Sequence, residues 1–196
     1  MTVNDAVQRV CEMAARHLSP DRVRQARERD AAVLRWEDAD YLPLKFGVKV
    51  PELKDLPGYD WTEQFYDPAK SFVMQMKGVV GSLASGSDVV PSIRGDMGVV
   101  NGPSLFGAKY DVPAHTKPVV NEYVPKEVLQ DMRLPEDIAG LGTMPRVIEH
   151  TRWHQATLRQ WKLGDWITVH HCDIQGPFDI AEQTRGHDLF TDFFED

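Results

Sequence analysis

Residues 166–181 read WITVHHCDIQGPFDIA, and this stretch decides the fold. Its first part, Trp166–Cys172, predicts a strand. Gly176 and Pro177 end that pattern and predict a turn, and the residues from Phe178 to Gln183 predict the start of a helix or a further turn. A strand that passes through a short turn into a helix is the building unit of parallel α/β sheets.

The segment before this strand predicts a long helix over Met144–Leu163. Pro145 suits the first turn of a helix, and Gly164 suits the position just after its end. Strands and helices alternate along the rest of the chain, which is typical of βαβ units and a parallel sheet. The other expected helices cover residues 3–16, 20–36, 69–84 and 188–195, the other expected strands cover 40–46, 88–93 and 108–112, and residues 47–68 are expected to form an ordered loop.

Composition and charge exclude several classes of protein. The chain has 196 residues and a formal net charge of -8, which argues against non-specific nucleic-acid binding. An anionic small-molecule substrate remains compatible, because a local pocket can be basic on an acidic protein. Cys11 and Cys172 lie far apart in the sequence, so we expect no disulfide scaffold. We therefore expect a cytoplasmic location. No apolar run approaches the ~20 residues that span a bilayer, and residues 1–16 do not look like a secretory signal.

Three blocks of sequence, taken in their order and spacing, resemble the uroporphyrinogen decarboxylase superfamily. They are DYLPL at 40–44, GSDVVPSIRGDMG at 86–98 with LFGA at 105–108 and TKPV at 116–119, and CDIQGPFDIA at 172–181. The resemblance implies an α/β fold, a (β/α)8 TIM barrel of parallel strands with outer helices. Closing such a barrel takes roughly 250 residues or more. We therefore expect an N-terminal helical segment over 1–39 and an incomplete barrel, roughly the first half, over 40–196.

In such a barrel the active site lies at the C-terminal ends of the strands. By resemblance, Asp96 lies within about one residue of the decarboxylase aspartate that binds pyrrole N–H groups, so Asp96 is the expected catalytic residue. The alternative is that Asp96 caps a turn before Gly98. Arg94 is expected to clamp a substrate carboxylate through its planar fork, or else to form an ordinary salt bridge.

The second expected part of the site is the turn after Trp166–Cys172. Asp173 and Gln175 end the predicted strand, and their side chains are expected to bind substrate at the mouth of the pocket. Gly176 permits close approach of the backbone, and Phe178 is assigned to the same substrate-binding segment by resemblance. The alternative is that this segment forms a helix N-cap and turn.

No metal site is expected. His170 and Cys172 could share one face of a strand, but His171 points to the other face and no third ligand is near in sequence. His150 and His154 have the i, i+4 spacing that can bind a metal, but they lack a His-Glu-x-x-His pattern. A barrel helix faces outward, so a solvated or packed face is the better interpretation of this pair.

Three functions remain open at this stage. The first is a carbon–carbon lyase, a decarboxylase that needs no cofactor and acts on a tetrapyrrole or a related anionic small molecule. The second is a methyltransferase-type relative that works with a corrinoid protein, a thiol and zinc. The third is a non-catalytic fragment or half-barrel. Two departures from the decarboxylases favour a divergent branch of the superfamily. Residues 46–52 lack the Arg-rich segment of the decarboxylases, and Gln183 stands where they have a Tyr. We expect no nucleic-acid or membrane partner, and either a homo-oligomer or a complementing half-barrel.

Overall fold

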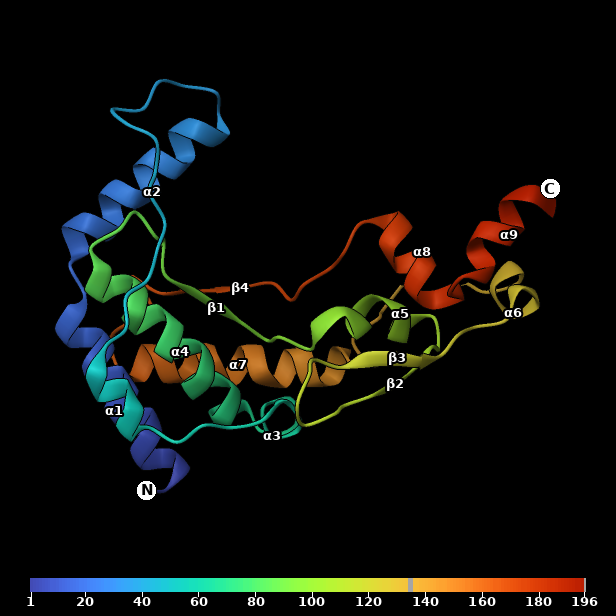
Figure 1. Ribbon diagram of the computed structural model, residues 1–196, viewed down its shortest axis with the longest axis horizontal. Helices are drawn as coiled ribbons and strands as arrows, with labels where there is room; N and C mark the ends of the chain where they lie inside the picture. The colour runs from blue at the N-terminus through green and yellow to red at the C-terminus, as the bar shows by residue number, and fades with distance from the viewer. Residues whose placement is uncertain (134–135, 196) are drawn as a thin grey trace. The chain divides into compact units, whose positions relative to one another are not determined.

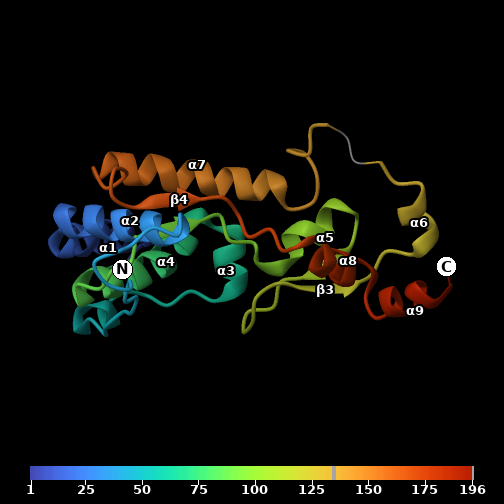
Figure 2. The same ribbon diagram turned by 90° about the horizontal axis from the view of Figure 1, so that it is seen from above.

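The computed structural model describes residues 1–133 and 136–195, and its chain divides into two compact units. The first unit comprises Met1–Tyr59, Pro68–Arg94 and Arg152–His170, and the second comprises Asp60–Asp67, Gly95–Thr151 and the residues from His171 onward. The ribbon is shown in two views in Figures 1 and 2. Within the described part of the chain, no helix combines the length and the hydrophobicity needed to cross a membrane.

The first unit is built mainly from helices around one hydrophobic core. Thr2 and Asp5 form a reciprocal capping box that starts the first helix. One face of the fourth helix buries Phe72, Val73, Met76 and Val80, and burial of each such side chain stabilises the fold by about 1.5–3 kcal/mol. The helices of this unit are α1 (Val3–His17), α2 (Pro20–Leu34), the short η1 (Pro51–Asp55), α4 (Pro68–Ser85) and the second half of α7 (Met144–Gln160).

A parallel strand pair completes the first unit. β1 (Ser92–Arg94) pairs with β4 (Thr168–His170), with Ile93 opposite Val169. Figure 1 shows the two strands side by side. The side chain of Gln75 binds both backbone groups of Arg94, accepting from its N–H at 2.9 Å and donating to its carbonyl at 2.8 Å. The expected parallel pairing is therefore confirmed, although both strands are shorter than predicted.

The strand predicted over residues 40–46 is wrong. The segment forms no strand ladder; the backbone of Leu44 binds Asp88, and the Phe46 carbonyl accepts from the hydroxyls of Ser85 and Ser87. The Leu44 N–H donates to the Asp88 carboxylate at 3.1 Å, and the Asp88 N–H donates to the Leu44 carbonyl at 2.8 Å. Pro43 has no N–H to offer to a neighbouring strand. A buried carboxylate, which Arg29 also contacts at 2.8 Å, thus holds this segment where a strand was expected.

The second unit combines short helices with a β-hairpin. Its small core gathers Phe65, Met97, Val147 and Cys172. Residues 61–66, predicted as loop, form a helix, which the capping box of Asp60 and Glu63 starts. Its elements are α3 (Trp61–Tyr66), η2 (Gly98–Val100), α5 (Asn101–Leu105), β2 (Lys109–Asp111), β3 (Val119–Glu122), α6 (Lys126–Gln130), the first half of α7, α8 (Pro177–Arg185) and α9 (Asp188–Glu195).

The fold class is α/β, and the complete or half barrel is not shown. In residues 1–133 and 136–195 the strands form two two-stranded sheets, β1 with β4 in parallel and β2 with β3 in antiparallel. The predicted helices over 3–16, 20–36, 69–84, 144–163 and 188–195 are confirmed within a few residues at their ends. The strand predicted over 108–112 corresponds to β2, whereas β3, α5 and α6 were not predicted.

Candidate functional site

The candidate site is formed by two segments of the second unit, residues 95–105 and 171–178, which the sequence placed after two strands. Asn101 joins them, because its side-chain N–H donates to the Cys172 Sγ at 3.0 Å and reaches the Asp173 carbonyl at 3.5 Å. Met97 and Cys172 also belong to the same small core. The structure therefore brings the two predicted segments into contact.

A buried polar network fixes this junction. The Thr143 hydroxyl donates to the Asn101 side-chain carbonyl at 2.6 Å, and the Thr143 N–H donates to the Ser104 hydroxyl at 3.1 Å. The Ser104 hydroxyl donates in turn to the Asn101 backbone carbonyl at 2.9 Å. All three residues are at most 6% exposed, so loss of one partner would leave a buried polar group unsatisfied, at a cost of about 1–3 kcal/mol.

The network also requires a glycine. Gly142 has a φ of +49°, and a Cβ there would lie 2.3 Å from the Ser104 hydroxyl and 2.7 Å from the Ser104 backbone. These residues were missed in the sequence because their contacts are distant along the chain. The only local signal was the run Asn101-Gly102-Pro103-Ser104 inside a stretch interpreted as mostly irregular.

Asp96 lies in a turn of the second unit, and its side chain is 16% exposed. One carboxylate oxygen accepts from the Gly98 N–H at 3.0 Å, which is the turn-capping arrangement considered for it. The other lies 3.5 Å from the Lys117 Nζ, and that ammonium group is 5.3 Å from the centre of the Trp61 ring. A carboxylate held in this way can still accept a hydrogen bond from a ligand, so its catalytic role stays a prediction.

Arg94 belongs to the first unit and is the last residue of β1. Gln75 binds its backbone, as described above, and its side chain is partly buried. The predicted carboxylate clamp stays a prediction for this residue.

The segment 173–178 runs through irregular backbone into the start of a helix, and no turn is assigned where one was predicted. Gly176 is the N-cap of α8, and its carbonyl accepts from the Ile180 N–H at 3.0 Å. The Gln175 side chain accepts from the Gln183 side chain, and Asp173 is partly buried. Phe178 is 53% exposed and stacks on Phe193 of α9, with 6.4 Å between the ring centres. The structure thus shows a helix start with Gly176 at the N-cap and no side chain capping it, and substrate binding by Asp173, Gln175 and Phe178 stays a prediction.

The sequence left two interpretations of the histidine pair of α7, a solvated face or a packed face. The pair is packed, and it does not face outward as expected for a barrel helix. His150 and His154 are both 0% exposed. In the first unit, the His154 Nε2 lies 3.1 Å from the Pro68 carbonyl, and its ring centre is 5.5 Å from that of Phe72. In the second unit, burial lowers the pKa of His150 to about 4, and the positive charge of Arg146 adds to the effect. His150 is therefore neutral at physiological pH.

The described residues do not fit a metal site. Throughout residues 1–133 and 136–195, no group of three or more His, Cys, Asp or Glu side chains is arranged to hold an ion. His170 is exposed, whereas Cys172 is buried and accepts a hydrogen bond from Asn101. Burial raises the pKa of the other cysteine, Cys11, to about 12, with a contribution from the charge of Glu12, so its thiol is protonated at neutral pH.

The fold is α/β, and between its two parallel strands the chain forms a β-hairpin, short helices and the long helix α7. A methyltransferase from Methanosarcina mazei has a similar structure, with a TM-score of 0.57 and 20% sequence identity. The similarity covers 84% of this chain and 46% of that chain, so this chain spans about half the length of the similar protein. At this identity the similarity establishes the fold alone. No family model and no curated protein sequence matches the chain.

Proposed function

We propose that this chain is a methyltransferase-type relative within the uroporphyrinogen decarboxylase superfamily, a cytoplasmic protein that acts with a corrinoid and a thiol. The observation that carries the proposal is the structural similarity to a methyltransferase over 84% of the chain. The sequence blocks at 40–44, 86–98 and 172–181 support the superfamily, and the missing Arg-rich segment argues against a uroporphyrinogen decarboxylase.

The residues of this chain would bind and orient the substrate. Asp96 supplies a partly exposed carboxylate that can accept a hydrogen bond, and Asp173 and Gln175 lie in the adjoining segment, which Asn101 holds in place. In methyltransferases of this type, zinc activates the thiol as a thiolate. The described residues do not fit a zinc site, so we assign no metal-dependent step to them.

Binding to two tetrapyrroles tests this proposal. The purified chain would be titrated, without oxygen, with methylcobalamin and with uroporphyrinogen, and calorimetry would measure both dissociation constants. We expect methylcobalamin to bind more tightly, and Asp96→Asn to weaken that binding about tenfold, because a charged hydrogen-bond acceptor is lost. Asp111→Asn is the matched control, since Asp111 is an exposed carboxylate on β2.

Two outcomes would reject the proposal. Preferential binding of uroporphyrinogen, with release of carbon dioxide, would assign the chain to the decarboxylases instead. If Asp96→Asn and Asp111→Asn changed the affinity for methylcobalamin equally, Asp96 would not belong to the binding site.

We also propose that the chain works with a protein partner, either a second copy or a complementing half-barrel. The support is an exposed aromatic surface on α8 and α9, where Phe178, Phe190, Phe193 and Phe194 are 47–90% exposed. Exposed apolar surface of this kind is typical of interaction sites. Light scattering measures the result: a dimer supports self-association, whereas a monomer that stays soluble at high concentration and on heating contradicts the need for a partner.

A further inference from the structure

The helix α2 of the first unit ends in a turn that places a tryptophan where glycine is preferred. The Glu37 N–H donates to the Ala32 carbonyl at 2.9 Å. The Trp36 N–H donates to the Val33 carbonyl at 3.1 Å. This pair of hydrogen bonds defines a Schellman motif, in which the residue just after the helix takes the left-handed conformation. Trp36 is that residue, with a φ of 58°, and its Cβ makes the conformation unfavourable.

Trp36 adds no packing to the first unit that would offset this strain. Its side chain is 97% exposed. Leu34, the last residue of α2, is 81% exposed, and Leu42, in the loop that follows, is 79% exposed. Large apolar side chains that gather at the surface mark sites where another protein binds. A strained and exposed aromatic residue at this position therefore points to a contact outside the fold.

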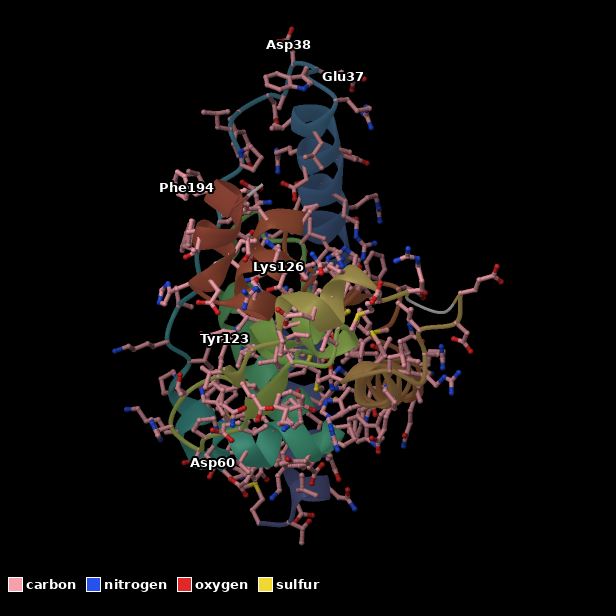
Figure 3. All side chains as sticks on the ribbon, turned by 90° about the vertical axis from the view of Figure 1, so that its right-hand side faces the viewer. Glu37, Asp38, Asp60, Tyr123, Lys126 and Phe194 are labelled. Atoms are coloured by element: carbon pink, nitrogen blue, oxygen red, sulfur yellow. The ribbon has the colours of Figure 1, made fainter. Side chains whose placement is uncertain are left out.

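A polar hollow of about 320 Å³ lies between α2 and the loop after it, and the turn that carries Trp36 joins these two walls. Its lining includes Glu28 and Asp38, and Asp38 projects at the end of α2 together with Glu37 (Figure 3). Neither Glu28 nor Asp38 forms an ion pair with any other residue that the structure describes. The hollow therefore carries an excess of negative charge.

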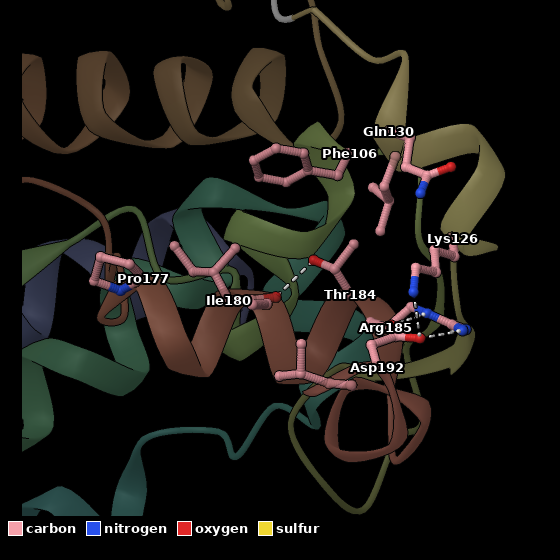
Figure 4. A pocket seen from close by; sticks show the side chains of 11 residues that line it. Phe106, Lys126, Gln130, Pro177, Ile180, Thr184, Arg185 and Asp192 are labelled. Atoms are coloured by element: carbon pink, nitrogen blue, oxygen red, sulfur yellow. Dashed lines mark hydrogen bonds and ion pairs between the residues drawn. The ribbon is translucent and has the colours of Figure 1, made fainter. Parts of the chain in front are cut away.

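The cations of residues 24–45 cannot neutralise this excess, because each already binds another group. Arg24 binds Asp21, Arg27 binds the carbonyls of Asp165 and Trp166, Arg29 binds Asp40 and Asp88, Arg35 binds Glu37, and Lys45 binds Asp30. The cavity of about 370 Å³ between α6, α8 and α9 of the second unit differs in this respect (Figure 4). Its charged side chains are paired, since Arg185 binds Asp188 and Asp192, and Lys126 lies 3.6 Å from Asp192.

Exposed apolar side chains beside unpaired carboxylates define the chemistry of a partner. We propose that the end of α2 is a docking surface for a protein that presents a basic amphipathic segment, in which apolar side chains alternate with Lys or Arg. Trp36 supplies the large apolar contact that is typical of binding hot spots. Glu28 and Asp38 attract the basic side chains by charge complementarity. The inference does not rest on the proposed methyltransferase function, because it uses a different set of residues.

Two synthetic peptides of equal length test the proposal on the whole chain. One is an amphipathic helical peptide of leucine and lysine, and the other has glutamate in place of every lysine. Calorimetry should show that the lysine peptide binds with one peptide per chain and that the glutamate peptide does not bind. Absence of binding by the lysine peptide, or equal binding by both peptides, would overturn the proposal.

Trp36→Gly separates a role in binding from a role in folding. Glycine suits the left-handed conformation at this position, so the urea midpoint of the variant should stay the same or rise. Its affinity for the lysine peptide should fall about tenfold, because the largest apolar contact is lost. Phe194→Ser is the control, since Phe194 is a 90% exposed aromatic residue of the second unit. An unchanged affinity in Trp36→Gly, a lower urea midpoint, or an equal loss of affinity in Phe194→Ser would contradict the proposal.

A pair of double variants tests the charge of the surface. Glu28→Gln with Asp38→Asn should weaken binding of the lysine peptide about fivefold and reduce its dependence on salt. Glu52→Gln with Asp165→Asn is the matched control, because it removes two exposed carboxylates of the same unit and changes the net charge equally. Equal weakening by the two double variants would assign the binding to net charge and reject the docking surface. A dimer by light scattering that Trp36→Gly converts to a monomer would also reject it, in favour of a second copy of the chain.

Discussion

His150 should make the protein less stable in acid. Its side chain is 0% exposed, and burial lowers its pKa from 6.5 to about 4, with Arg146 acting in the same direction. The charge of Asp67 and a hydrogen bond to the Phe65 backbone oppose the shift but do not cancel it. The folded protein therefore binds the proton less readily than the unfolded chain does.

The sign and the size of the effect follow from this difference. The stability that neutral His150 contributes is fully present above pH 6.5, falls as the pH drops from 6.5 to about 4, and then stays constant. Lowering the pKa of His150 from 6.5 to about 4 corresponds to about 3 kcal/mol of stability, since a tenfold change in proton affinity corresponds to about 1.4 kcal/mol.

Urea unfolding followed by tryptophan fluorescence would measure this effect between about pH 7.5 and about pH 4. Carboxylates also titrate in this range, so the quantity to compare is the difference in unfolding free energy between the wild type and His150→Gln. That difference should change by about 3 kcal/mol in favour of the variant as the pH falls. His115→Gln is the control, because it removes an exposed imidazole of the same unit. A difference that stays constant across the range would refute the reasoning.

Three further predictions concern stability and can be measured by the same unfolding assay. Asn101→Ala should destabilise the protein by about 1–3 kcal/mol, because buried partners lose their hydrogen bonds, whereas Asn121→Ala on the exposed face of β3 should have little effect. Gly142→Ala should destabilise by about 1–3 kcal/mol through its positive φ and its clash with a backbone, and a result equal to that of Gly140→Ala, where nothing lies within 4 Å, would contradict this. Asp60→Ala should cost about 0.5–2 kcal/mol by removing the cap of α3, and circular dichroism should show a matching loss of helix.

The elements that the sequence predicted well carry their own boundary signals. Gly86, with a φ of +67°, directly follows α4, and Pro145 lies in the first turn of α7, so these boundaries could be placed from neighbouring residues. The predicted C′ position of Gly164 is wrong, because α7 ends at Gln160 and Lys162 takes the left-handed conformation, with a φ of 55°. The parallel pairing of β1 and β4 followed from the alternation of elements around them.

The failures arise from contacts between residues far apart in the sequence. Residues 40–46 have an apolar pattern that suits a strand, but Asp88, more than forty residues later, binds their backbone. The turn at Asp96 could be foreseen from Gly98 two residues on. The junction at Asn101 could not, because Thr143 and Cys172 reach it from distant segments.

The side chain of Gln75 makes the two edges of the small parallel sheet unequal. The Thr168 N–H donates to the Pro91 carbonyl, so the backbone groups of alternate residues around β1 face β4. The N–H and carbonyl of Arg94 face the opposite edge of the sheet, where the Gln75 side-chain amide binds them. A further strand would therefore pair more readily with β4, because pairing beside β1 would first have to displace the Gln75 side chain from the Arg94 backbone. One glutamine thus satisfies the backbone groups that Arg94 presents at one edge of the sheet, which makes that edge a poorer template for a further strand.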